Sequence, residues 1–163
     1  MCYATNVLAQ EDTEAPTREL GLASSNLTND FSLIYKKELS ENRYRVFDGE
    51  LNLNVVFVES SSSSFFTSFS LGTENRKYLN EKIKFVRGPN YGLGLFVAEA
   101  GVSFMPFFRY QLGVQYDVNE MIYLGVSTFP TASLRIQTAE EIPISSLNIN
   151  GSFNAQLSAI FRF

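Results

Sequence analysis

Residues 147–163 read LNINGSFNAQLSAIFRF, and this stretch decides the fold. Successive side chains of a β-strand point to opposite faces of the sheet. The odd positions from Leu147 to Phe163 are Leu, Ile, Gly, Phe, Ala, Leu, Ala, Phe and Phe, whereas the even positions are Asn, Asn, Ser, Asn, Gln, Ser, Ile and Arg. Apart from Ile160, the even face is wholly polar. The stretch therefore predicts one long β-strand with an apolar face and a polar face.

The same alternation recurs upstream, and short polar turns separate the copies. Leu39–Tyr44, Leu79–Ile83 and Val118–Tyr123 form a weak repeat of about forty residues, in which Ser or Asn and a Glu stand between two β-rich runs. Such residues suit a tight hairpin turn. More variable and often longer polar stretches lie between these turns. The pattern predicts eight antiparallel strands over residues 17–24, 30–39, 43–58, 65–77, 82–97, 102–116, 121–136 and 147–163.

Short turns on one side and longer loops on the other are typical of outer-membrane β-barrels. Eight strands with three tight turns and four loops place both chain ends on the tight-turn side. No stretch approaches the roughly 18 apolar residues that a membrane helix needs. We therefore expect an all-β, eight-stranded antiparallel up-and-down transmembrane β-barrel over residues 17–163, with both termini in the periplasm.

The composition excludes several classes of function. With 13 Lys+Arg against 17 Asp+Glu the chain carries a net charge of −4, which argues against a partner that is nucleic acid. There is no His, so His-based catalytic sets and Cys/His metal sites are excluded. A single Cys allows no disulfide within the chain. We expect no cofactor, no metal and no enzymatic activity.

Alternation alone does not tell which face lies inside, because a soluble lipocalin-like barrel alternates too. The polar face is rich in Ser, Gly, Asn and Gln, whereas a soluble surface usually carries more Lys and Glu. The apolar faces are too bulky to fit together inside an eight-stranded barrel. Aromatic residues also gather near strand ends, as in a membrane-interface girdle. We therefore expect the apolar face to meet lipid and the polar face to line the lumen.

This orientation sends charges of both signs into the lumen. Buried charges need partners, so we expect ion pairs and amide hydrogen bonds that plug the barrel. A narrow polar path or a proton relay is the alternative interpretation. The predicted polar network of the lumen consists of Glu19, Lys36, Glu38, Glu50, Glu74, Arg76, Lys84, Arg109, Arg135 and Arg162.

Three arginines do not fit the alternation. Arg43 and Arg45 share the parity of the lipid-facing residues, so either they lie at the periplasmic rim or a β-bulge near Asp48-Gly49 switches the phase. Arg87 also falls on the lipid-facing parity. A local irregularity beside it, such as a bulge at Gly88-Pro89, would keep its charge out of the membrane.

The amino end reads as a processed leader. Val7-Leu8-Ala9 has the small-residue pattern of a signal-peptidase site, although a basic segment and a full apolar segment before it are missing. We interpret residues 1–9 as the remnant of a signal peptide and residues 10–16 as a short periplasmic lead. A disordered terminus is the alternative.

Several stretches together resemble a known group of proteins. These are Glu19-Leu20-Gly21-Leu22, Phe31–Leu39 (FSLIYKKEL), the turn repeats and the terminal Ile160-Phe161-Arg162-Phe163. The chain resembles small outer-membrane β-barrels of the OmpA/OmpX type, and looks most similar to uncharacterised barrels of Bacteroidota. The resemblance implies a Gram-negative outer membrane, lipid as a partner, and an assembly signal at Phe161 and Phe163 that the barrel-assembly machinery recognises.

Several functions remain compatible with the sequence. The leading hypothesis is a non-enzymatic, monomeric barrel with a plugged lumen and a structural or surface-contact role, in which Gln137–Ser146 and Glu59–Ser64 offer contact loops of unknown partner. A small porin-like pore or transporter is the second, and a soluble ligand-binding barrel the third. A lipid-modifying enzyme is disfavoured because no His is present to act as a base.

Overall fold

The computed structural model describes residues 17–26, 30–54, 64–98, 101–138, 144–150 and 155–163. The predicted signal-peptide remnant and periplasmic lead, residues 1–16, lie outside the described residues. No helix in the described part of the chain is long and apolar enough to cross a membrane. The strands are β1 (Arg18–Asn26), β2 (Asp30–Ser40), β3 (Arg43–Asn54), β4 (Ser64–Tyr78), β5 (Ile83–Ala98), β6 (Gly101–Asp117), β7 (Ile122–Thr128), β8 (Thr131–Thr138), β9 (Ile144–Asn150) and β10 (Ala155–Arg162).

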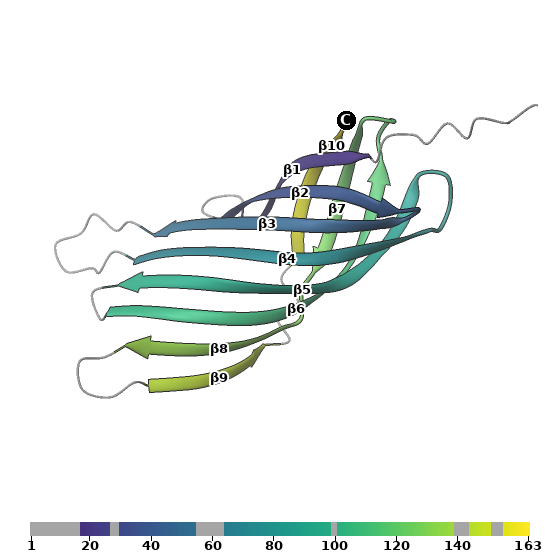
Figure 1. Cartoon of the computed structure of the whole chain (residues 1–163). Helices are drawn as coiled ribbons and strands as arrows, with labels where there is room; N and C mark the ends of the chain where they lie inside the picture. Colours follow the sequence, from purple (N-terminus) through teal and green to yellow (C-terminus); the bar gives the residue numbers. More distant parts are fainter. Residues whose placement is uncertain (1–16, 27–29, 55–63, 99–100, 139–143, 151–154) are drawn as a thin grey trace, which may run out of the picture.

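The strands form a single antiparallel sheet that closes on itself (Figure 1). Strands β1 to β6 pair in chain order. Strand β6 pairs with both β7 and β8, β8 pairs with β9, and β7 pairs with β10. The pairing of β10 with β1 closes the barrel. The predicted eight-stranded up-and-down barrel is confirmed, with the seventh strand divided into β7 and β8 and the eighth into β9 and β10.

The division of the seventh strand is local. Leu112 lies opposite Thr128, and Arg109 lies opposite Thr131, so the register continues unchanged across the gap. Pro130 stands in the gap and has no N–H to donate to a neighbouring strand. Its carbonyl still accepts a hydrogen bond of 3.0 Å from the amide of Tyr110. Strands β7 and β8 are therefore one barrel strand that lacks a backbone hydrogen-bond donor at Pro130.

The repeated turns have the same local structure in two of their three copies. The side-chain oxygen of Asn80 accepts hydrogen bonds from the amides of Lys82 and Ile83, at 2.9 and 2.7 Å. The equivalent oxygen of Asn119 accepts from the amides two and three residues further on, at 2.9 and 2.8 Å. The first turn instead places Asn42 at a φ of 61°, which asparagine tolerates better than most residues. We call the end of the barrel with these turns the turn end, and the opposite end the loop end.

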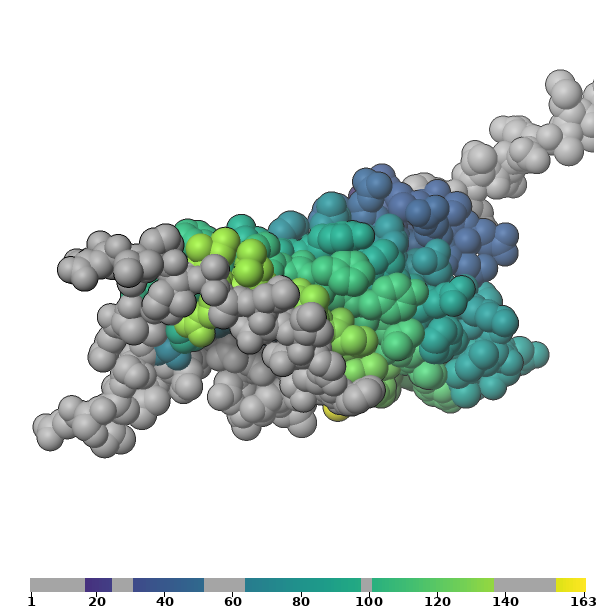
Figure 2. Space-filling view, turned by 90° about the horizontal axis from the view of Figure 1, so that it is seen from below, coloured from purple at the N-terminus to yellow at the C-terminus, as the bar shows by residue number. Residues whose placement is uncertain are grey.

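The apolar face points outward, as predicted. Leu157 and Phe161 of β10 are exposed, whereas Ile160 between them is fully buried. Large apolar side chains are exposed on the other barrel strands too, while most of the buried polar side chains point inward. The side chains of β4 to β7 form a continuous outer surface in the space-filling view (Figure 2). The inverted arrangement of a membrane barrel, with the polar face inside, is therefore the observed one.

Ile160 is the one apolar residue on the inward, polar face of β10, and its packing explains why. Ile160 joins a small inward-facing cluster with Ala23, Ile34, Val46 and Tyr123. Its side chain occupies the space over Gly21, where an added Cβ would lie 2.4 Å from the Ile160 Cδ1 atom. The missing side chain at position 21 therefore makes room for a large apolar one opposite it.

A β-bulge, which was one of the explanations considered for the three arginines, is absent at Asp48-Gly49 and at Gly88-Pro89. Strand β3 pairs with β2 and β4 in unbroken register through Asp48 and Gly49, so no bulge switches its phase there. Arg43 and Arg45 are exposed on the outer face at the turn end, which was the other alternative.

Arg87 is exposed on the outer face as well, and the register of β4 with β5 is the same on both sides of Gly88-Pro89. No residue is inserted, but the ladder skips two pairs between Gly72–Asn90 and Asn75–Arg87, so the expected local irregularity is present without a bulge. The backbone at Gly88 approaches Thr73 so closely that an added Cβ would lie 1.7 Å from the Thr73 carbonyl oxygen. Glycine thus lets the strand pass a proline without a bulge.

Candidate functional site

A cluster of charged and aromatic side chains fills the lumen at the turn end. Every second residue of a barrel strand points inward, so the inward face of each strand contributes to this cluster. We call it the lumen cluster. Its members are Glu19 from β1, Lys36 from β2, Tyr44 from β3, Glu74 and Arg76 from β4, Lys84 from β5, Gln115 and Asp117 from β6, Tyr123 from β7 and Arg162 from β10.

Arg76 is the centre of the lumen cluster. Its two terminal nitrogens donate to the two carboxylate oxygens of Glu19, at 2.7 and 2.6 Å. Its Nε donates to Glu74 Oε1 at 2.7 Å. The side chains of all three residues are at most 1% exposed. A guanidinium that binds one carboxylate with both terminal nitrogens and a second carboxylate with Nε is held in a single orientation.

A second cation balances the carboxylate of Glu74. Lys36 Nζ donates to Glu74 Oε2 at 2.6 Å, and Gln115 Nε2 donates to Glu74 Oε1 at 3.0 Å. Glu74 is fully buried and Lys36 is 3% exposed. The carboxylate thus accepts hydrogen bonds on both oxygens, which is the condition under which a buried charge is tolerated.

A rim of ion pairs extends the lumen cluster towards the turns. Asp117 accepts hydrogen bonds from Arg162 at 2.6 Å and forms an ion pair of 2.8 Å with Lys84. Arg162 Nε also donates to Glu19 Oε1 at 3.3 Å. Arg162 therefore joins the rim to the central Arg76–Glu19 pair.

Two tyrosine rings complete the packing around Arg76. The guanidinium carbon lies 3.7 Å from the centre of the Tyr44 ring and 5.1 Å from that of Tyr123. The hydroxyl of Tyr123 donates to Glu19 Oε2 at 2.7 Å and accepts from Arg76 Nη2 at 3.0 Å. Aromatic faces attract a guanidinium when water is excluded, so the rings both fill space and stabilise the charge.

A separate polar layer lies nearer the middle of the barrel. Arg109 forms a hydrogen-bonded ion pair with Asp48, and its Nη2 donates to Ser70 Oγ at 3.0 Å. Buried atoms without a protein partner here include Asp48 Oδ1 and Arg109 Nε, and Gln115 Oε1 is one too. The cavity between this layer and the lumen cluster has a volume of about 20 Å³, room for about one water molecule.

The predicted network residues occupy different places. Glu19, Lys36, Glu74, Arg76, Lys84 and Arg162 meet in the lumen cluster. Arg109 pairs with Asp48 in the next layer, and Glu50 accepts a hydrogen bond of 3.1 Å from Ser68. Towards the loop end, Arg135 donates to Ser103 at 3.3 Å. Glu38 accepts a hydrogen bond of 3.3 Å from the amide of Thr17 and lies directly opposite Tyr44 of the lumen cluster in the sheet register.

Sequence reasoning missed five participants in these layers. Asp48 entered the sequence analysis only as the place of an alternative β-bulge, and Asp117 lies at a strand end beside a turn. Tyr44 and Tyr123 are aromatic, although their alternation does place them on the polar face. Gln115 falls on the polar parity of its strand but is not among the residues of the predicted network. The alternation of the strands alone is enough to predict that the two tyrosines and Asp48 point into the lumen.

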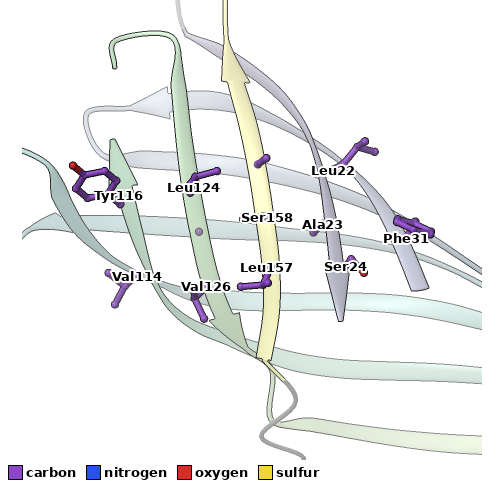
Figure 3. A pocket seen from close by; sticks show the side chains of 12 residues that line it. Leu22, Ala23, Ser24, Phe31, Val114, Tyr116, Leu124, Val126, Leu157 and Ser158 are labelled. Atoms are coloured by element: carbon purple, nitrogen blue, oxygen red, sulfur yellow. The ribbon is translucent and has the colours of Figure 1, made fainter. Parts of the chain in front are cut away.

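An apolar hollow lies on the outside of the barrel, across β6, β7, β10 and β1 (Figure 3). Its volume is about 530 Å³, and side chains such as Leu22, Leu124, Val126 and Leu157 line it. No charged residue lines it. The hollow therefore extends the apolar outer face and is separate from the lumen cluster.

Known structures share this architecture. The N-terminal β-barrel domain of Pseudomonas aeruginosa OprF is similar with a TM-score of 0.57 and 13% identity, over 91% of this chain and 96% of that one. This chain has the fold of an eight-stranded outer-membrane β-barrel. Neisserial surface protein A is similar too, with a TM-score of 0.54 and 15% identity over 90% of this chain and 92% of that one. No protein-family model and no curated protein sequence matches the chain.

The outer-membrane β-barrel fold leaves the chemistry of the lumen to its own residues. Within the described residues no group of three or more His, Cys, Asp or Glu side chains is arranged to hold a metal ion. The carboxylates of Glu19 and Glu74 are instead occupied by guanidinium, ammonium and amide donors. The arrangement joins strands to one another across the lumen.

Proposed function

We propose that the protein is an integral outer-membrane barrel with a plugged lumen, without enzymatic activity, whose role is structural or one of surface contact. The observation that carries this proposal is the lumen cluster, which lies inside an apolar outer face. A bundle of mutual ion pairs blocks the lumen, whereas the outward Leu and Phe side chains suit acyl chains. In this proposal the barrel is a monomer, and its turn end and both termini face the periplasm.

The plug predicts the electrical behaviour of the purified protein. In planar bilayers the wild-type protein should give no steady large conductance, because the lumen holds a cavity of only about 20 Å³ between its two polar layers. A porin added to the same membranes serves as the positive control. Replacing Arg109 with Ala should likewise give no steady conductance, because the lumen cluster nearer the turn end stays intact. Steady conductance that changes in Arg109→Ala would support the alternative of a small pore.

The contact surface of the proposed role is the loop end. The candidate loops Gln137–Ser146 and Glu59–Ser64 lie largely outside the described residues. Relatives with the same fold include Neisserial surface protein A, whose name places it at a cell surface. A surface-contact role for the loop end of this chain follows from that likeness as a proposal.

Phe161 and Phe163 are proposed to form the signal that the barrel-assembly machinery recognises. Both are exposed on the outer face at the end of the last strand, where a partner protein has access to them. Replacing both with Ala should lower the amount of folded barrel in the outer membrane severalfold in cells. Heat-modifiable mobility on gels measures the folded fraction. The matched control is Leu157→Ala in the same strand and on the same face, which should assemble more efficiently than the double variant. Equal assembly of the two would contradict the proposal.

A further inference from the structure

The positive charges of the chain are distributed unevenly over the barrel. Of the 13 Lys and Arg residues, six point into the lumen and Lys82 lies in a turn. All of the remaining six are exposed on the outer face, each within five residues of the turn end of its strand. We call them the basic patch, and its members are Arg18, Lys37, Arg43, Arg45, Lys77 and Arg87, on strands β1 to β5.

The basic patch has no negative charge of its own. Lys37 lies directly opposite both Arg18 and Arg45 in the sheet register. Asn75 likewise lies directly opposite both Arg43 and Arg87. Like charges placed opposite each other destabilise a sheet. None of the ion pairs among the described residues includes a member of the patch, and no outward-facing residue of β1 to β5 is an Asp or Glu.

An apolar row lies immediately next to these cations, towards the loop end. The row runs through Leu20, Tyr35, Phe47, Leu71 and Tyr91, which are directly opposite one another on β1 to β5. The rings of Tyr35 and Phe47 are 5.9 Å apart. An arrangement of cations beside aromatic and aliphatic side chains matches a membrane interface, where long basic side chains reach towards the headgroups.

The basic patch covers only one side of the barrel. On β6, β7 and β10 the outward positions at the turn end are occupied by residues such as Val114, Tyr116, Leu124 and Phe161. A surface that is only solvated usually mixes both signs of charge. The outward charges of β1 to β5 all have the same sign and lie at about the same depth. This arrangement indicates a negatively charged partner at that depth.

We infer that the basic patch binds the anionic headgroups of phospholipids at the turn end of the barrel. The inference rests on the proposed membrane location. Phosphates of lipids that surround the barrel would lie between Arg18, Lys37 and Arg45 and neutralise their mutual repulsion. The acyl chains of the same lipids would cover the adjoining apolar row. The protein therefore selects anionic over zwitterionic lipid along β1 to β5.

Spin-labelled lipids test this selectivity directly. The wild-type protein is reconstituted in phosphatidylcholine vesicles that contain a trace of spin-labelled phosphatidylglycerol or phosphatidylcholine, and electron paramagnetic resonance measures the fraction of label immobilised by the protein. The wild type should favour phosphatidylglycerol severalfold, because each basic side chain near an anionic lipid surface is worth about fivefold. Salt at about 1 M, where the Debye length is about 3 Å, should remove the preference.

Two triple variants separate charge from structure. In Lys37→Gln/Arg45→Gln/Arg87→Gln, which retains Arg18, Arg43 and Lys77, the preference should fall severalfold below that of the wild type. In the charge-retaining control Lys37→Arg/Arg45→Lys/Arg87→Lys it should persist. An unchanged preference in the neutralised variant overturns the inference, as does a wild type that immobilises both lipids equally. If the wild type immobilises neither lipid, the protein is not in the bilayer, and it is the proposed membrane location that fails.

Discussion

Replacing Arg76 with Met should destabilise the barrel by about 3–5 kcal/mol, the usual cost of removing one partner from a buried ion pair. Arg76 donates to both Glu19 and Glu74, and neither carboxylate has access to solvent. Methionine keeps much of the volume but supplies no donor. Urea unfolding of the protein in lipid vesicles, followed by the change in gel mobility between folded and unfolded chains, measures the loss in free energy.

Matched variants show whether the effect comes from the buried carboxylates. Lys77→Met changes the next residue of β4, which is exposed on the outer face, and should alter the unfolding free energy by less than about 0.5 kcal/mol. Adding Glu19→Gln to Arg76→Met should restore part of the stability, since Glu74 keeps its ion pair with Lys36 and neither buried position then carries a carboxylate without a cation. Arg76→Met with wild-type stability would mean that the lumen cluster is not a buried ion network.

Replacing Phe69 with Arg should cost about 2–4 kcal/mol, the penalty for an arginine on the lipid face at the middle of a membrane barrel. Phe69 lies near the centre of β4 (Ser64–Tyr78), one outward position further from the basic patch than the apolar row, and is 57% exposed on the outer face. The same urea titration in vesicles measures the cost. Phe69→Ala serves as a control for the loss of side-chain contacts.

The position of the charge should matter as much as its presence. Asn75→Arg places a charge on the same face of β4, six residues nearer the turns and directly opposite Arg43 and Arg87. Its cost should stay at or below about 1 kcal/mol, because an arginine near the interface reaches the headgroups. If Phe69→Arg is also tolerated within about 0.5 kcal/mol, as for a solvated surface position, the outer face does not meet lipid.

The sequence by itself determined the number of strands, their order and the side that each face takes. These properties are local: the two-residue period fixes which side chains share a face, and Asn80 and Asn119 fix where the chain reverses. The sequence also predicted which face points outward, because the lumen of an eight-stranded barrel has no room for a bulky apolar face.

Only the tertiary structure decided which inward charges meet. Arg76 binds Glu19, 57 residues away in the chain, because closure of the barrel brings β1 and β4 to face each other across the lumen. Parity states that both point inward, but not that they lie at the same depth, since depth depends on the register of every intervening strand pair. The same dependence explains why Asp117 was missed and why no bulge was needed at Arg87, where Gly88 allows a close backbone approach that no sequence period reveals.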